Sequence, residues 1–203
     1  MKKKNFLEIL QRFHKVNILP WIGSKYDQPD ILPYKTLILG ESNYTSREGF
    51  NPELVIECVK DHIGPNEDPN FSRFATKIRR TIFGWNTTIS AEKFWENVAF
   101  YNFVQYRVGK RSKERPSEKM WRQSVEAFEE VVITLQPDRI LVIGLENWKN
   151  LISHLDHENV NNYIAIFKIK NCKFLAGYIA HPSSYGFSYR KWHPIAKDIL
   201  LKT

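Results

Sequence analysis

The stretch that decides the fold reads Thr36-Leu37-Ile38-Leu39-Gly40-Glu41-Ser42-Asn43-Tyr44. A short, continuous apolar run that ends at a glycine is typical of a strand buried in a parallel sheet. Similar runs alternate with amphipathic helical patterns. The expected strands are 98–103 and 139–143. The expected helices are 52–63, 71–83, a helix that Ser117 caps and Pro137 ends, and a helix that contains Trp148, Ile152 and Leu155. This alternation predicts an α/β fold, a three-layer α/β/α sandwich with a mostly parallel central sheet.

The two ends of the chain complete this plan. The remaining expected elements are a helix at about 5–15, a loop at 20–33, strands at about 163–169 and 174–180, and a helix at about 190–201. The turn Lys170-Asn171 follows the first of the two late strands closely, so this pair is expected to depart from the parallel arrangement. A chain of 203 residues can bury one core, and we expect a single domain, 1–203, with the helix and loop of 1–35 packed on it. No exposed apolar helix face requires a partner, so a monomer is expected and the oligomeric state is otherwise open.

Composition excludes several classes of protein. Hydrophobic residues make up 42% of the chain, too many for a disordered protein, and no apolar run reaches the length of a membrane span. After the basic Lys2-Lys3-Lys4, Glu8 and Arg12 interrupt the apolar stretch too early for a signal peptide. The two cysteines, Cys58 and Cys172, have no metal-ligand spacing and suit a reducing compartment. We therefore expect a cytoplasmic protein with no membrane partner, no metal and no cofactor.

The net charge of +8 is compatible with two interpretations. It favours a polyanionic partner, or it serves solubility alone. The position of the basic residues supports a polyanionic partner, because two basic groups follow expected strands. Lys110, Arg111, Lys113 and Arg115 follow the strand 98–103, and Arg190 and Lys191 follow the strand at about 174–180. Cations placed beside a site can hold a phosphate backbone, whose neutralisation dominates nucleic-acid affinity.

Three polar segments stand at the ends of expected strands. They are Gly40-Glu41-Ser42-Asn43-Tyr44, Tyr101-Asn102-Phe103 and His181-Pro182-Ser183-Ser184-Tyr185. Ligands of open α/β sheets bind beyond the carboxyl ends of the strands, so these segments predict one shared site suited to a planar polar ring. The chain has no GxGxxG fingerprint, P-loop or HExxH motif, which argues against dinucleotide, P-loop nucleotide and zincin functions.

These segments resemble the motifs of the uracil-DNA glycosylase superfamily, and the resemblance runs from Leu37 to about Leu200. Many members read Gly-Gln-Asp-Pro-Tyr-His or Gly-Glu-Ala-Pro-Gly after the first strand, where this chain has Gly40-Glu41-Ser42-Asn43-Tyr44-Thr45. The other similar segments are Asn70-Phe71-Ser72-Arg73-Phe74, the strand Val98 to Arg107 with Asn102, Arg115-Pro116-Ser117-Glu118, Gln136 to Gly144, and His181-Pro182-Ser183. The order and spacing of the set are fairly specific, although each motif alone is weak.

The resemblance implies a DNA glycosylase that hydrolyses the N-glycosidic bond of uracil, or of a related damaged base, flipped out of single- or double-stranded DNA. Its fold would be the uracil-DNA glycosylase-like fold, and its tasks would be divided among three groups of residues. The catalytic residues would be Glu41 and His181; the base would be bound by Ser42, Asn43, Tyr44, Phe71 and Asn102; and DNA would be contacted by Ser183, Ser184, Tyr185 and Arg190.

The resemblance also implies individual roles, which suit the chemistry of each side chain. The Asn102 amide both donates and accepts, which suits the O4 and N3 edge of uracil. His181 would donate to the base O2, Phe71 would stack on the ring, and Tyr44 would exclude a 5-methyl group. The wedge that fills the gap left by the base would be Tyr185, Phe187 or Arg190.

Two departures from the family's pattern keep other functions open. Members with Gly-Glu-Ala-Pro-Gly use four cysteines to hold an iron–sulfur cluster; this chain has two, and Tyr106 stands near one expected cysteine, so that cluster is excluded. Ser42 occupies the position of a water-activating aspartate, and Glu41 stands one residue earlier. The alternative is therefore a catalytically weakened module that binds nucleic acid or a modified base or nucleotide. A basic interaction protein that kept only the scaffold is a third possibility.

Each candidate residue also has a structural interpretation. Phe71 would be a core residue, Asn102 would cap the end of its strand, and His181 would be a turn residue bonded to backbone. Tyr44 would lie on the surface, and Glu41 would form an ion pair with a lysine or cap the following helix. The aromatic residues proposed as the wedge would fold back onto the core. His193 also precedes a proline but lacks such neighbours, and we expect it to be structural.

Overall fold

The computed structural model describes residues 15–44, 51–65, 68–109 and 114–202, and for Tyr44 it describes the backbone only. The strands are β1 (Trp21–Ile22), β2 (Thr36–Gly40), β3 (Asn43–Tyr44), β4 (Val98–Asn102), β5 (Arg107–Gly109), β6 (Arg139–Ile143), β7 (His157–Asn159), β8 (Ile164–Ile169) and β9 (Cys172–Ile179). The helices are α2 (Leu54–Ile63), α3 (Pro69–Phe83), α4 (Ala91–Glu96), α5 (Glu118–Leu135), α6 (Leu145–His154) and α7 (Tyr189–Leu200).

The central sheet is mixed, with a parallel centre and antiparallel edges. Its strand order is β1-β4-β2-β6-β9-β8-β7, and β4, β2, β6 and β9 run parallel to their neighbours within this set. The outer strands β1, β8 and β7 pair antiparallel. The expected parallel arrangement is thus found at the centre. The antiparallel departure expected for the last two strands is confirmed in β8 and β9, which Lys170, in the left-handed region at φ 51, and Asn171 join by a tight turn. The antiparallel edge strands β1 and β7 were not expected.

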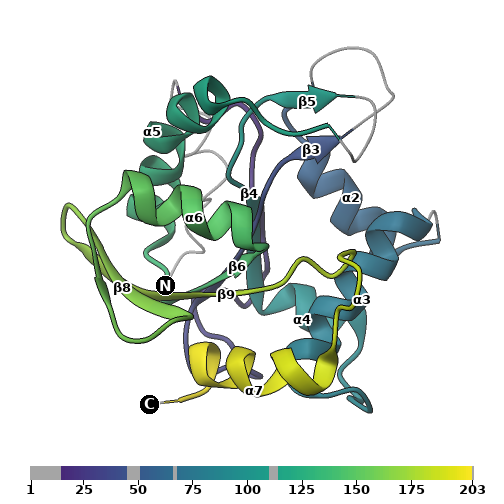
Figure 1. Ribbon diagram of the computed structural model, residues 1–203. Helices are drawn as coiled ribbons and strands as arrows, with labels where there is room; N and C mark the ends of the chain where they lie inside the picture. The colour runs from purple at the N-terminus through teal and green to yellow at the C-terminus, as the bar shows by residue number, and fades with distance from the viewer. Residues whose placement is uncertain (1–14, 45–50, 66–67, 110–113, 203) are drawn as a thin grey trace.

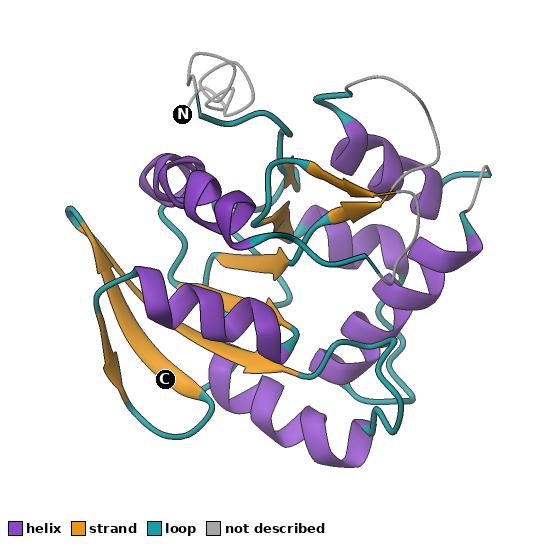
Figure 2. Cartoon of the chain, turned by 45° about the horizontal axis from the view of Figure 1, so that its top comes forward, coloured by secondary structure: helices purple, strands orange, loops and turns teal. Residues whose placement is uncertain are grey.

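Helices cover both faces of the sheet, as Figures 1 and 2 show. Because side chains alternate along a strand, Leu37 and Leu39 pack toward one face with α5 and α6, while Ile38 packs toward the other with α2, α3, α4 and α7. Each face has its own apolar cluster of fully buried residues. The arrangement is consistent with the predicted three-layer sandwich.

The helix ends follow local capping chemistry. The Ser117 side chain accepts a hydrogen bond from the Met120 N–H at 3.3 Å, and the last turn of α5 ends at Gln136 in the left-handed region, just before Pro137. The expected helix between Ser117 and Pro137 is thus confirmed. Helix α3 begins at Pro69, earlier than the expected residue 71, because the Asp68 side chain accepts from the Asn70 N–H and a proline is favourable in the first turn.

Other expectations need correction or lie outside the described residues. The expected loop 20–33 contains the short strand β1, and β3, β5 and β7 were not expected. The expected helix at 5–15 lies outside the described residues, apart from Lys15. No helix in the described ranges is long and apolar enough to cross a membrane. The structural role expected for His193 is supported, since its Nδ1–H donates to the Thr81 carbonyl at 2.8 Å and ties α7 to α3.

Candidate functional site

The ends of β2 and β4 meet at Gly40 and Asn102, which are direct partners in the parallel register. The Asn102 side chain lies over Gly40, since a Cβ added to Gly40 would stand 2.0 Å from Asn102 Oδ1 and 3.2 Å from Phe100 Cε2. Any larger residue at position 40 would displace the amide. The glycine that ends the decisive stretch therefore makes room for the neighbouring strand's asparagine.

A buried amide network holds Asn102 in place. Asn102 Nδ2 donates to Asn43 Oδ1 at 2.7 Å, and the Asn102 carbonyl accepts from Gln105 Nε2 at 2.9 Å. The Gln105 Oε1 in turn accepts from the N–H of Ile18 at 2.8 Å. Asn102 and Asn43 are only 7% and 8% exposed, so these bonds form away from water and fix the direction of the amides.

Asn147 is a site residue that the sequence did not point out. It is fully buried on α6, and its Nδ2 donates to the carbonyls of Leu39 at 3.1 Å and Gly40 at 2.9 Å. This amide reaches the end of β2 from the opposite layer of the sandwich. The signal in the sequence is a polar residue beside Trp148, at a position where an amphipathic helix turns toward the sheet.

Several buried polar atoms near the end of β2 have no protein partner. They are Ser42 Oγ, Asn43 Nδ2 and Asn147 Oδ1. Unpaired buried polar groups cost free energy unless a ligand or water satisfies them. The segment after β2 thus offers hydroxyl and amide groups to a polar partner.

Glu41 forms an ion pair with Arg115. The Glu41 carboxylate is 10% exposed, and its Oε1 lies 2.9 Å from Arg115 Nη1, whose side chain is 68% exposed. The segment before α5 therefore lies against the segment after β2. The competing interpretation of Glu41 as an ion-pair member holds, although with an arginine and not a lysine.

His181 follows β9 and carries a neutral imidazole. Burial, with the charges of Arg115 and Lys77, lowers the pKa of His181 from 6.5 to about 4. Its Nδ1 accepts from the Ser183 N–H at 3.2 Å, so the proton of the neutral ring is on Nε2. The ring therefore offers an N–H donor at neutral pH, while its other nitrogen is bonded to backbone.

Aromatic rings of α3 connect His181 with the end of β2. Phe74 lies 5.3 Å from the His181 ring and 6.2 Å from Phe100, measured between ring centroids. Phe71 lies 6.0 Å from Phe100 and is stacked on Trp95 at 6.1 Å. Phe71 is partly buried and packs on the core, as its structural interpretation expected; Phe74, not named as a site residue, is the ring beside the histidine.

Asn102 and His181 stand on the same face of the sheet, three strands apart. The order β4-β2-β6-β9 separates the two strand ends by about 14 Å at the usual spacing of strands. Phe74 packs on both the His181 ring and Phe100, two residues before Asn102, so the two strand ends border the same aromatic side chain of α3.

The remaining predicted residues follow β9 or lie outside the description. Ser183, Ser184 and Arg190 are exposed, and Tyr185 is fully exposed at 107%. Phe187 is only partly exposed and packs on the core, as the interpretation of a folded-back loop expected. The side chain of Tyr44, and residues Lys110, Arg111 and Lys113, lie outside the described residues.

A cavity lies along α3, and none of the predicted strand-end residues lines it. Its volume is about 460 Å³, and it follows the outer surface of α3, from Pro69 past Arg73 and Lys77 to Trp85. In the described ranges no group of three His, Cys, Asp or Glu side chains is placed to hold a metal ion.

No protein-family model matches the chain, and no curated protein matches it in sequence.

Proposed function

We propose that this protein is a DNA glycosylase of the uracil-DNA glycosylase-like fold, which hydrolyses the N-glycosidic bond of uracil or a related damaged base. The observation that carries the proposal is the pair of groups at the ends of β4 and β9, on one face of the sheet. One is the Asn102 amide held over Gly40, and the other is the neutral His181 imidazole with its Nε2–H. The partner would be DNA, single- or double-stranded, and the location cytoplasmic, as the cysteine content favours.

The Asn102 amide reads the polar edge of the base in this proposal. Its carbonyl oxygen accepts from N3–H and its NH₂ donates to O4, a combination that cytosine does not match. Asn43 supports the orientation of this amide, and its own unpaired Nδ2 adds a donor near the same edge. Phe71 and Phe74 supply the apolar wall of α3 against which the ring stacks.

His181 acts on the departing base. The bond between the sugar C1′ and the base N1 breaks, and the bonding electrons leave with the base, so negative charge develops on O2. The Nε2–H of the neutral imidazole donates to this oxygen, and one such donor contributes roughly 10²–10³ in rate. A water oxygen then bonds to C1′ and gives its proton to the Glu41 carboxylate, which Arg115 orients.

The ion pair of Glu41 favours a second candidate function. The Glu41 Oε1 is engaged by the Arg115 guanidinium at 2.9 Å, and Ser42 brings no carboxylate of its own. The second candidate is therefore a module that binds a modified base or nucleotide in the same place without cleaving it.

Release of uracil from a single-stranded oligonucleotide tests the proposal. Wild type is expected to release uracil, and Asn102→Ala and His181→Ala are expected to lose roughly 10²–10³ of that rate. Asn150→Ala and His157→Ala are matched controls, since Asn150 bonds only within its own helix and His157 lies on the edge strand β7. Salt-dependent binding of DNA without release of any base would reject the glycosylase and support the binding module.

A further inference from the structure

The geometry points to a second binding site, a groove on the outer face of α3 that holds the single-stranded DNA flanking the base. This inference rests on the proposed function, because it assigns a path to the strand whose base enters the strand-end site. The groove is the cavity of about 460 Å³ described above. The residues that give it its chemistry are Arg73, Thr76, Lys77, Arg80, Trp85 and Tyr189.

The cations of the groove lie on one face of α3. Arg73, Lys77 and Arg80 follow one another at intervals of four and three residues, the spacing that places side chains on the same side of a helix. No aspartate or glutamate is among the described residues that line the groove. Arg73 and Arg80 are about 10 Å apart along the helix axis, so they would contact different phosphates of one strand.

Trp85 offers a stacking surface at the end of this row. Its side chain is 56% exposed, which is unusual for a residue of this size. The Arg80 guanidinium lies 4.5 Å from the Trp85 ring centroid, and Tyr189 meets Trp85 at 4.9 Å and 69° between ring planes. The indole is thus held in place on one face and one side, and its other face remains available to a base.

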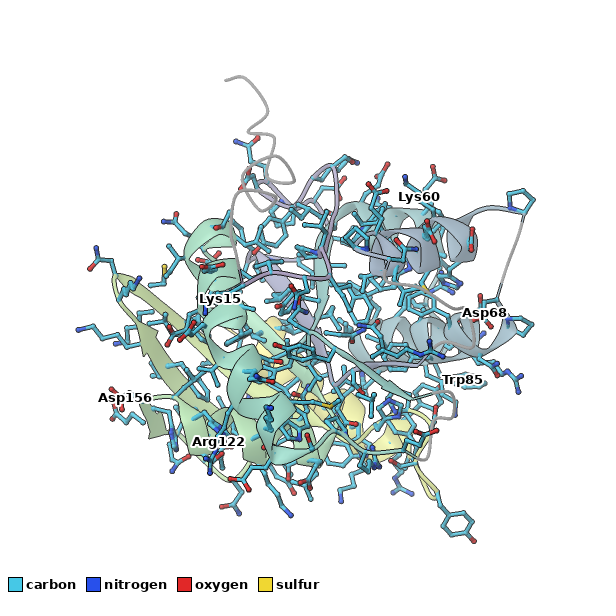
Figure 3. The ribbon with its side chains drawn as sticks, turned by 90° about the horizontal axis from the view of Figure 1, so that it is seen from above. Lys15, Lys60, Asp68, Trp85, Arg122 and Asp156 are labelled. Carbon is cyan, nitrogen blue, oxygen red and sulfur yellow. The ribbon has the colours of Figure 1, made fainter. Side chains whose placement is uncertain are left out.

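A basic face interleaved with an aromatic surface distinguishes single-stranded nucleic acid from other anions. Phosphates account for the cations, but an acidic peptide or an isolated phosphate would not require an ordered, exposed indole. Figure 3 shows Trp85 and Asp68, the cap of α3, at the same margin of the molecule, opposite Asp156. The groove runs from Pro69 along α3 to Trp85, which comes shortly after the last residue of the helix.

The groove and the strand-end site share a border. Lys77 lines the groove, donates through Nζ to the Pro182 carbonyl at 2.7 Å, and is one of the charges that lower the pKa of His181. Phe187, at the end of the same loop, lies 5.8 Å from Lys77 Nζ and 5.5 Å from the Tyr189 ring. A strand that leaves the site across this loop passes directly into the groove.

Binding of a fluorescein-labelled oligothymidylate of about 15 nucleotides, followed by anisotropy, tests the groove. Trp85→Ala is expected to weaken binding by roughly 5- to 100-fold, the loss that corresponds to one stacked base. The double variant Arg73→Ala/Arg80→Ala is expected to lower the salt slope by about 1.4, at about 0.7 for each phosphate of a single strand. The control is Lys149→Ala/Lys168→Ala, which removes the same charge from exposed positions on α6 and β8.

The groove assignment is overturned if both groove variants bind like the control, with their fold verified by an unchanged melting temperature. It is also overturned if polyglutamate of equal charge competes as well as oligothymidylate, since stacking would then contribute nothing. The oligothymidylate contains no uracil, so this binding assay does not depend on the proposed reaction. If Trp85→Ala weakens binding but wild type releases no base, the groove is supported and the proposed reaction is rejected. If wild type releases uracil but Trp85→Ala binds the oligothymidylate as tightly as wild type, the reaction is supported and the groove is rejected.

Discussion

The segment after β2 and the segment after β9 both end strands of the parallel centre, yet they are built in opposite ways. The first is buried: the Asn102 amide lies over Gly40 and donates to Asn43. The second is open, with Ser183, Ser184 and Tyr185 exposed. In the second, His181 packs against Phe74, and the buried Pro182 accepts a hydrogen bond from Lys77. The difference teaches that one side of the candidate site is rigid and preformed, whereas the other combines one anchored ring with an exposed loop.

The largest expected effect on stability is the response of His181 to acid. Its pKa is lowered to about 4, while in the unfolded chain it titrates near 6.5, so the unfolded state binds more protons as the pH falls between these values. Folding is therefore expected to lose on the order of 3 kcal/mol from this group between pH 6.5 and 4, and nothing from it above pH 6.5. Urea unfolding at pH 7.5 and 4.5 should show a smaller loss for His181→Gln than for wild type. Equal losses in both proteins would mean that His181 is not buried in its neutral form.

The second effect contrasts two glycines, one from each segment. Gly40→Ala places a methyl group 2.0 Å from Asn102 Oδ1 and should cost about 1–3 kcal/mol while displacing the amide. Gly186→Ala meets no atom within 4 Å, and its cost of about 1 kcal/mol comes only from the positive φ of 73°. Unfolding free energies should rank the variants in this order, and only Gly40→Ala should abolish a thermal shift by uracil. If Gly186→Ala lowered the free energy of unfolding more than Gly40→Ala does, the segment after β2 would not be the more tightly packed of the two.

The third effect measures the amide network. Asn43→Ala leaves the buried Asn102 Nδ2 without its acceptor and should lower the free energy of unfolding by about 1–2 kcal/mol. Ser184→Ala, in the exposed segment, is the comparison and should change it by less than about 0.5 kcal/mol. Chemical denaturation of both variants gives the answer, and equal stability of the two would show that the network is not closed in solution.

The smallest effect on stability is expected at Tyr185, which contacts little of the protein. Tyr185→Ala should change the free energy of unfolding by less than about 0.5 kcal/mol. Under the proposed function it should still slow base release from duplex DNA, where a wedge must fill the gap, more than from a single strand. A ratio of duplex to single-strand rates equal to that of wild type would remove the wedge from the proposal.

Local patterns predicted the elements that carry the site, and they failed where pairing is not local. The strand at β6 and the helix from Ser117 to Pro137 are confirmed, because apolar runs, a serine cap and a proline stop act within a few residues. The short strands β3 and β5 escaped prediction, since a two- or three-residue strand is stabilised by a partner some sixty residues away and not by its own composition.

For the candidate site, the sequence identified Asn102 and His181, but not the groups that hold or surround them. Asn147 reaches Gly40 from α6, and Phe74 meets His181 from α3; both contacts join residues that are distant in the sequence. The ion pair of Glu41 with Arg115 joins residues 74 positions apart. The row of cations on α3 was not predicted as a site, and Trp85 and Tyr189, which complete the groove, come from a turn and another helix.

The sequence by itself determined the α/β class, the helix between Ser117 and Pro137, the antiparallel final pair of strands, and the polar chemistry at each strand end, because these depend on periodicity and on interactions between near neighbours in the chain. The tertiary structure alone decided that β1 and β7 add antiparallel edges, that Gly40 lies under Asn102, that Glu41 is bonded to Arg115, and that α3 carries a groove on the side away from the sheet. The physical reason is register: strand pairing and helix packing bring together groups that are distant in the chain, and their distances and burial exist only once the sheet has formed.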